Sequence, residues 1–229
     1  MNVQGYQKLT LLDFPGHVAC TVFTGGCNLR CPFCHNARLV RAPLAFENAE
    51  DEVLAYLEKR RGILEGVCVT GGEPLLQEDL VSFLAKIRDM GYLIKLDTNG
   101  SLPGRLAHVL QTGLVDYVAM DVKSSPAGLA AAVGREADFA PYRESIELLR
   151  GCGVPHEFRT TVVKGIHTPG DLAQIATILG DESYYLQRFV DSGNLLGTGC
   201  DAFSESEMRE MLTLVRQHTP RAMLRGQDE

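Results

Sequence analysis

A regular alternation of short apolar runs with amphipathic helical patterns constrains the fold most strongly. Six runs rich in β-branched residues read as strands, at 19–23, 67–70, 93–97, 117–120, 157–163 and 184–189. The stretches between them place apolar residues three and four positions apart and read as helices, at 48–61, 78–90, 102–111, 142–150 and 171–179. Strands that alternate with helices pair in parallel through right-handed crossovers, which gives an open doubly wound sheet or a barrel. The chain is therefore predicted to be an α/β protein.

Capping signals mark the starts of two predicted helices. Thr168 precedes Pro169 and Asp171 at the start of the helix at 171–179, and Ser204 with Glu207 forms a capping-box pattern for a last helix at 204–218. No internal repeat, low-complexity stretch or linker divides the sequence. With 229 residues, of which 45% are hydrophobic and 22% charged, the chain is predicted to form a single domain.

Composition argues against a secreted, membrane or nucleic-acid-binding protein. The first residues lack a charged-then-apolar signal pattern, and no apolar stretch approaches the roughly 18 residues of a membrane span. A net charge of -7 disfavours nonspecific nucleic-acid binding, which needs clustered cations. We therefore expect a cytoplasmic location, with no membrane contact and no direct nucleic-acid binding.

Three closely spaced cysteines, Cys27, Cys31 and Cys34, follow the first predicted strand in a C-x-x-x-C-x-x-C pattern. A 4Fe–4S cluster held by three protein thiolates keeps one iron free to bind another molecule, whereas electron-transfer clusters normally use four. Zinc bound by the three thiolates and His35 is an alternative, although Cys34 and His35 are neighbours and would have to bend onto one ion. A disulfide with a spare thiol is a second alternative, which the absence of secretory signals disfavours. The four scattered cysteines read as buried thiols without an assigned role: Cys20, Cys68, Cys152 and Cys200.

The other unusual residues fall at or near the ends of predicted strands. They are Gly71, Gly72 and Glu73 after the second strand, Asp97, Thr98 and Asn99 at the third, Asp121 and Lys123 at the fourth, and Arg159 within the fifth. Each motif alone has a structural interpretation, either a tight turn or a surface ion pair. In parallel α/β folds, however, the carboxyl ends of the strands share one ligand site. We therefore expect these residues to line a common pocket.

As a set, these motifs resemble those of the radical S-adenosylmethionine (SAM) superfamily, and the resemblance covers roughly residues 10–189. Within it, the chain is most similar to the glycyl-radical-enzyme activases, in particular the longer form of the anaerobic ribonucleoside-triphosphate reductase activating proteins. The stretches that carry this closer resemblance are 8–16 (KLTLLDFPG), 31–36 (CPFCHN), 96–100 (LDTNG), 115–123 (VDYVAMDVK) and 157–163 (EFRTTVV).

The resemblance implies an incomplete (β/α)6 barrel of parallel strands with outer helices. Residues 1–18 would be an N-terminal lead-in, 19–190 the partial barrel and 191–229 a C-terminal helical extension. No cysteine lies between Cys34 and Cys68, so the two-cluster insertion of some relatives is absent and one 4Fe–4S cluster is expected.

The resemblance also implies roles for individual residues. Cys27, Cys31 and Cys34 would bind the cluster, and with Lys123 they would form the catalytic set. SAM would be bound by Phe33 and His35 beside the adenine, and by Gly71, Gly72 and Glu73 at the methionine amino group. Asp97, Thr98 and Asn99 would lie near the ribose or a bound cation, and Asp121, Lys123 and Arg159 at the carboxylate end.

The function implied is reductive cleavage of SAM to a 5′-deoxyadenosyl radical that abstracts a glycine α-hydrogen from a partner glycyl-radical enzyme. That partner would be anaerobic ribonucleoside-triphosphate reductase, with a flavodoxin- or ferredoxin-like electron donor. Three alternatives stay open: an activase for a formate-lyase-type enzyme, a small-molecule enzyme of the deazapurine synthase type, and a zinc-bound interaction domain without catalysis.

Overall fold

The structure, a computed structural model, describes residues 1–40, 49–191 and 193–225. Eight strands form one sheet in which their spatial order follows the chain. They are β1 (Val3–Thr10), β2 (Ala19–Thr24), β3 (Gly66–Gly71), β4 (Leu93–Thr98), β5 (Tyr117–Asp121), β6 (His156–Val162), β7 (Tyr184–Arg188) and β8 (Met223–Leu224). The six strands β2 to β7 pair in parallel with one another, so their carboxyl ends lie along one rim of the sheet.

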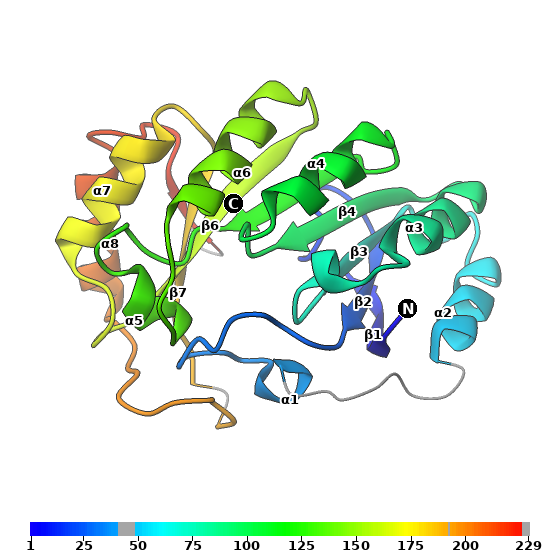
Figure 1. The fold of residues 1–229 in the computed structure, drawn as a ribbon, viewed down its shortest axis with the longest axis horizontal. Helices are drawn as coiled ribbons and strands as arrows, with labels where there is room; N and C mark the ends of the chain where they lie inside the picture. Colours follow the sequence, from blue (N-terminus) through cyan, green and yellow to red (C-terminus); the bar gives the residue numbers. More distant parts are fainter. Residues whose placement is uncertain (41–48, 192, 226–229) are drawn as a thin grey trace.

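Helices connect the parallel strands on the outer side of this curved sheet (Figure 1). The larger ones are α2 (Ala49–Glu58), α3 (Leu80–Asp89), α4 (Pro103–Gln111), α6 (Ala140–Gly151), α7 (Pro169–Leu179) and α8 (Glu205–Val215). Shorter ones are α1 (Ala37–Val40), the 3₁₀ turn η1 (Pro74–Leu76) and α5 (Leu129–Val133). Within the described residues the sheet has β1 at one edge and β8 at the other. The predicted α/β fold, an open partial barrel of parallel strands, is confirmed.

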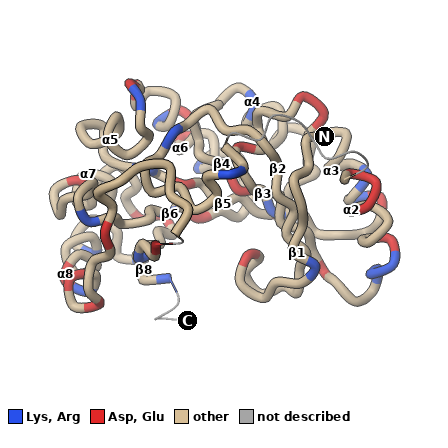
Figure 2. Tube along the Cα trace, turned by 90° about the horizontal axis from the view of Figure 1, so that it is seen from below, with Lys and Arg blue, Asp and Glu red and all other residues tan. Residues whose placement is uncertain are grey.

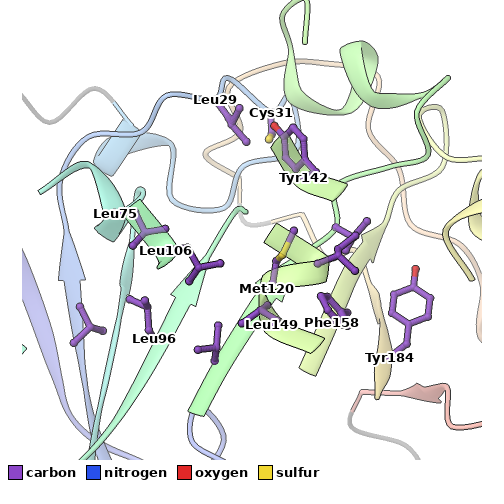
Figure 3. Packing of buried hydrophobic residues seen from close by; sticks show 14 of the residues in the cluster. Leu29, Cys31, Leu75, Leu96, Leu106, Met120, Tyr142, Leu149, Phe158 and Tyr184 are labelled. Carbon is purple, nitrogen blue, oxygen red and sulfur yellow. The ribbon is translucent and has the colours of Figure 1, made fainter. Parts of the chain in front are cut away.

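Apolar side chains between the strands and the outer helices form the main core (Figure 3). Leu96, Met120 and Phe158 from three neighbouring strands are fully buried, as is Leu106 from α4. Burying each such side chain contributes roughly 1.5–3 kcal/mol. The alternate residues of the same strands face the other side of the sheet, which leaves Lys95, Asp97 and other polar groups toward the interior of the partial barrel.

The structure adds elements that the sequence patterns did not predict. β1 runs antiparallel to β2 within what was expected to be an N-terminal lead-in, and β8 pairs with β7. Helix α5 was also missed, and α6 begins two residues before its predicted start. Asn48, the predicted start of the first helix, lies outside the described residues. These differences affect edges and short elements and leave the six predicted strands in place.

Both predicted helix caps are present. The Thr168 hydroxyl accepts a hydrogen bond from Asp171 N at the start of α7, and the Asp171 carboxylate accepts one from Thr168 N. Ser204 and Glu207 make the same reciprocal pair at the start of α8. Such pairs satisfy main-chain N–H groups that have no partner within the helix.

Charged residues lie on most outer helices and on the strands at the centre (Figure 2). Helix α8 carries acidic residues and Arg209, for example, whereas further charged positions lie on β4 and β6 inside the curve of the sheet. Over the described residues, none of the helices combines the length and the apolar composition that crossing a bilayer requires.

Candidate functional site

A cavity of about 250 Å³ lies at the carboxyl ends of the parallel strands. Every residue predicted for the site lines it: Cys27, Cys31, Phe33, Cys34, His35, Gly71, Gly72, Glu73, Asp97, Thr98, Asn99, Asp121, Lys123 and Arg159. The segment after β2 supplies the cysteines, and the ends of β3 to β6 supply the polar side chains. The structure thus brings together residues more than 100 positions apart, as the rule for parallel sheets predicts.

The cysteine loop is held against other parts of the chain by main-chain contacts. Arg30 N donates to Val133 O at 2.9 Å, and Gly197 N donates to Pro32 O at 2.9 Å. A Cβ at Gly197 would lie 2.7 Å from the Pro32 Cβ, so glycine allows this close approach. In Figure 1 the loop runs from β2 past α1 toward α5. Segments from two distant regions of the sequence, at Val133 and at Gly197, therefore hold the cysteine loop in position.

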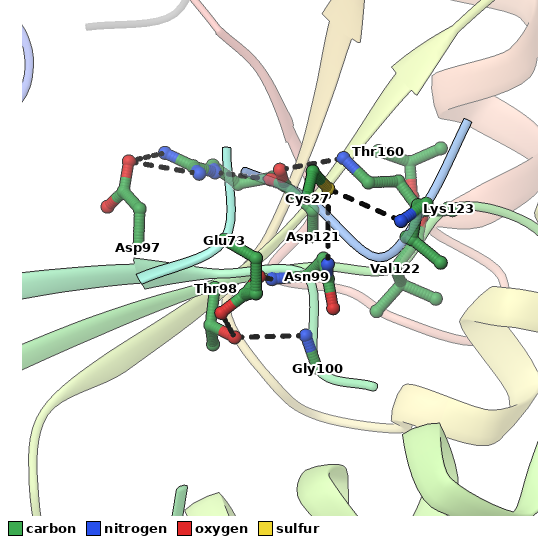
Figure 4. Close-up of polar contacts among 12 residues, drawn as sticks. Cys27, Glu73, Asp97, Thr98, Asn99, Gly100, Asp121, Val122, Lys123 and Thr160 are labelled. Atoms are coloured by element: carbon green, nitrogen blue, oxygen red, sulfur yellow. Dashed lines mark hydrogen bonds and ion pairs between the residues drawn. The ribbon is translucent and has the colours of Figure 1, made fainter. Parts of the chain in front are cut away.

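The three thiols are free and partly or fully buried. Burial raises the pKa of Cys27 and Cys34, and it raises the pKa of Cys31 to about 11. Leu29 N lies 3.4 Å from Cys27 Sγ, and Asn99 Nδ2 lies 3.9 Å from the same sulfur (Figure 4). Because ligands to a metal must be thiolates, metal binding here has to displace the thiol protons.

The three cysteine thiols suit a cluster that is held by three protein ligands. In the described ranges, no three His, Cys, Asp or Glu side chains lie close enough to hold one metal ion. The ring of His35 instead packs 5.5 Å from the ring of Phe189. In a 4Fe–4S cluster each cysteine binds a different iron, so three separated thiols facing one cavity are the appropriate donor set.

Glu73 is the most constrained acidic group in the cavity. It follows Gly72 in the turn after β3, is 1% exposed, and accepts hydrogen bonds from Leu75 N, the Thr98 hydroxyl and Asn99 N at 3.1, 2.9 and 2.7 Å. Burial raises its pKa to about 7, although these three donors and Lys123 oppose the shift. The carboxyl group is therefore fixed in position and poised between its protonated and ionised forms.

A line of alternating charges crosses three strands beside Glu73. Lys95 pairs with Asp97, Asp97 lies 3.2 Å from Arg159, Arg159 lies 2.9 Å from Asp121, and Asp121 lies 2.9 Å from Lys123. Figure 4 shows the part from Asp97 to Lys123. Burial alone would raise the pKa of both aspartates, but Arg159 and the lysines hold the pKa of each below its usual value. Both aspartates are consequently ionised at neutral pH.

The pKa values of the two basic groups that line the cavity are also shifted. Asp121 and neighbouring acids raise the pKa of Lys123 and of Arg159, although burial alone would lower both. The line therefore ends in an ammonium group that stays charged and faces the cavity. Such a group suits a carboxylate-bearing ligand.

The structure also places residues at the site that the sequence patterns did not single out. Those lining the cavity are Leu29, Asn36, Val40, Thr70, Pro74, Thr161 and Gln187. Thr161 lies two residues after Arg159 on β6, so strand alternation alone could have placed it on the same face. Loop positions such as Leu29 carry no comparable signal, because only tertiary contacts set the path of their backbone.

The chain is similar to a known protein family, to named proteins and to solved structures. The family model described as the radical SAM superfamily matches residues 21–179. A protein of Methanocaldococcus jannaschii, provisionally named as a glycyl-radical enzyme activating enzyme, is 26% identical over 97% of this chain and 95% of its own length.

Two further relatives match about half of the chain. A pyruvate formate-lyase-activating enzyme of Clostridium pasteurianum is 31% identical over 53% of this chain and 52% of its own length. A 7-carboxy-7-deazaguanine synthase of Halobacterium salinarum is 34% identical over 44% of this chain and 37% of its own length. Their names thus point to two different substrate classes.

Two solved structures show the same fold at low identity. One is a domain of a pyruvate-formate lyase-activating enzyme from Bacteroides vulgatus, with a TM-score of 0.58 and 18% identity over 71% of this chain and 99% of that one. The other is SuiB of Streptococcus suis bound to its precursor peptide SuiA, with a TM-score of 0.71 and 14% identity over 90% of this chain and 48% of that one.

Proposed function

This chain belongs to the radical SAM superfamily, and we propose that it is a glycyl-radical-enzyme activase whose partner is anaerobic ribonucleoside-triphosphate reductase. The observation that carries the activase proposal is the similarity, over nearly the full length of both chains, to a relative provisionally named as such an enzyme. The stretches at 8–16 and 115–123, which resemble the reductase activating proteins, support the choice of partner.

The cofactors of this superfamily are a 4Fe–4S cluster and SAM. Together they supply a 5′-deoxyadenosyl radical, which can abstract a hydrogen atom from an unactivated carbon. The residues of the chain have to hold both groups in contact and exclude water from them. The three free thiols, the fixed Glu73 carboxyl and the Lys123 ammonium meet these needs in one cavity.

The proposed division of roles follows the family resemblance, and all of these residues line the cavity. Cys27, Cys31 and Cys34 bind the cluster, and the turn at Gly71, Gly72 and Glu73 receives the methionine amino group. Lys123, which we place in the catalytic set, receives the carboxylate together with Arg159, while Asp121 holds both cations. Asp97, Thr98 and Asn99 lie toward the ribose, and Phe33 and His35 toward the adenine.

In the proposed reaction one hydrogen atom passes from a glycine Cα of the partner to the 5′ carbon derived from SAM. The products are 5′-deoxyadenosine, methionine and the partner's glycyl radical. The single electron consumed comes from a flavodoxin- or ferredoxin-like donor, and we propose that the reaction takes place in the cytoplasm. Within the described residues the strands form an open sheet and not a closed ring, which supports a macromolecular substrate.

Electron paramagnetic resonance tests the activase proposal. Anaerobic, cluster-loaded protein is reduced and mixed with SAM and either anaerobic ribonucleoside-triphosphate reductase or a formate-lyase-type enzyme. We expect a glycyl doublet only with the reductase, accompanied by stoichiometric 5′-deoxyadenosine. A doublet with the formate-lyase-type enzyme alone would reassign the partner. SAM cleavage without a doublet from either mixture would contradict the activase proposal.

A deazapurine synthase is the second candidate, because one relative with 34% identity over 101 residues carries the name 7-carboxy-7-deazaguanine synthase. That match spans 37% of the relative's length, whereas another protein of the same name is 26% identical over 79% of this chain and 73% of its own length. Incubation of the reduced protein with SAM and candidate small-molecule precursors, followed by mass spectrometry for a deazapurine product, separates the candidates. Formation of a deazapurine would favour this second function.

A further inference from the structure

His167, in the loop between β6 and α7, connects two walls of the cavity without lining it. Its side chain is buried, and its ring Nε2 lies 2.7 Å from the main-chain oxygen of Lys123. Its ring Nδ1 lies 3.0 Å from Val163 N. The ring also meets the ring of Phe33 edge-on, with 6.0 Å between centroids. One side chain therefore touches the ends of β5 and β6 and the cysteine loop.

The two hydrogen bonds determine the tautomer of His167. A main-chain N–H can only donate, so Nδ1 must accept from Val163 and carry no proton. A carbonyl oxygen can only accept, so Nε2 must carry the proton that it donates to Lys123. Burial lowers the pKa of His167, which favours this neutral form. The ring thus acts as a fixed link between two main-chain segments.

The hydrogen bond from His167 restricts the main chain of Lys123, whereas the ion pair with Asp121 restricts its ammonium group. The Lys123 ammonium is held by Asp121 at 2.9 Å, while its main chain is held by His167. With both ends anchored, the ammonium group can occupy only a small part of the cavity. Phe33 is likewise buried, and the His167 ring covers one of its sides.

We propose that His167 is a positioning residue for SAM, which it orients through Lys123 and Phe33 without touching it. The inference rests on the proposed SAM contacts of those two residues. Removal of the His167 hydrogen bond would loosen the Lys123 main chain and let its ammonium move away from the place where the methionine carboxylate binds. His167 therefore affects SAM affinity more than it affects cluster binding.

Two substitutions at this position separate the two hydrogen bonds. In His167→Gln the amide nitrogen can reach the place of Nε2 and still donate to Lys123 O. In His167→Asn the shorter side chain retains a polar atom near Nδ1 and loses the contact with Lys123. Thr168→Ala is the matched control, because it removes the neighbouring cap of α7 and leaves both His167 hydrogen bonds in place. Each variant is loaded with iron and sulfide, and its SAM dissociation constant is measured by equilibrium binding.

We expect His167→Asn to bind SAM about tenfold more weakly, the loss of roughly one hydrogen bond. His167→Gln should stay within about threefold of the wild type, and Thr168→Ala should lower the melting temperature without changing SAM affinity. Adding Lys123→Met to His167→Asn should cost no more than Lys123→Met alone, since residues that act through one another are not additive. Should His167→Asn lose iron, His167→Phe takes its place, because that ring fills the space without hydrogen bonds.

Wild-type affinity in the Asn or Phe variant would overturn the inference, and so would equal losses in the Gln, Asn and Thr168→Ala proteins. Failure of the loaded wild type to bind SAM would overturn it together with the roles proposed for Lys123 and Phe33. Normal SAM binding without a glycyl radical on any partner would instead contradict only the proposed activase function.

Discussion

At the scale of single residues, Glu73 links the site to the pH dependence of stability. Its pKa is about 7 in the folded chain and near 4.5 in an unfolded one, so the folded state holds the proton more tightly between these values. The stabilisation of the folded state that comes from the raised pKa of Glu73 is fully present below about pH 4.5 and is lost as the pH rises through 7. Each pKa unit corresponds to about 1.4 kcal/mol, which sets an upper limit of roughly 3.5 kcal/mol for the loss.

We therefore expect metal-free wild-type protein to lose part of its unfolding free energy between pH 5.5 and pH 8, an interval chosen to bracket the pKa of about 7. Glu73→Gln, which cannot ionise, should lack this component. Urea titrations at several pH values measure the difference between the two curves. Parallel curves over the whole interval would show that Glu73 does not titrate in this range.

Arg159 is the residue on which the line of charges depends, because it joins Asp97 to Asp121. Arg159→Met leaves each aspartate with one lysine and removes the central cation from a largely buried site. We expect a loss of about 2–4 kcal/mol in unfolding free energy, together with loss of SAM binding. Arg61→Met is the control, since its pair with Glu58 is about half exposed and should contribute less than about 1 kcal/mol. Equal effects of the two substitutions would contradict the importance of the line.

Cys31 is the most buried of the three cysteines on the loop. Cys31→Ser should abolish both the cluster and SAM cleavage, because serine oxygen is a poor substitute for a thiolate on iron. Cys152→Ser, far from the cavity in the groove between α4 and α6, is the matched control and should retain both. Iron analysis and visible absorption after anaerobic loading give the answer, and full iron content in Cys31→Ser would remove the residue from the ligand set.

At the scale of elements, the turn after β3 depends on close contact with the start of the cysteine loop. Gly72 N donates to Thr24 O at 2.9 Å, and a Cβ at Gly72 would lie only 2.0 Å from Gly26 O. Gly72→Ala should therefore push the turn away from the loop and lower both iron content and melting temperature. Gly104→Ala, where a Cβ meets nothing within 4 Å, should be neutral or slightly stabilising. Iron retention at the wild-type level in Gly72→Ala would contradict this packing.

The burial and length of each helix or strand explain whether the sequence predicts it. The strands β2, β3 and β5 read as largely apolar runs, whereas β4, β6 and β7 place polar residues between buried apolar ones, and both patterns predict strands. β1 is an edge strand with a glycine at position 5 and exposed polar residues, and β8 has only two residues, so neither has such a run. Helix α5, with five residues, is too short for periodicity to reveal. The missed elements are thus those whose formation depends on tertiary pairing.

The predicted residues of the site could be placed together because they sit at or near strand ends, where a general rule of topology applies. His167 could not be found in that way. It lies in a loop, and its partners are main-chain atoms of Lys123 and Val163, so no sequence spacing marks it. A residue that supports a site through hydrogen bonds to the main chain is not part of a recognisable sequence motif.

At the scale of the whole molecule, the cavity opens at the rim of an incomplete barrel, where the cluster's free iron would be accessible. We expect air to bleach the loaded protein and to abolish SAM cleavage, because an exposed iron and soft thiolate ligands are open to oxidants. Bound SAM should slow this loss by covering the free iron. Timed exposure to air with and without SAM, followed by visible absorption, measures the protection. Stable colour and turnover in air would contradict an open iron.

The anchoring of the cysteine loop has a consequence for how the protein matures. Its three supports come from the turn at Gly72, from Val133 and from Gly197, so the last of them is synthesised long after the cysteines. A nascent chain that has exposed only its first third carries the thiols and the turn at Gly72 but lacks the supports at Val133 and Gly197. We therefore expect the cluster to assemble in its final geometry after translation, on a chain that has already folded.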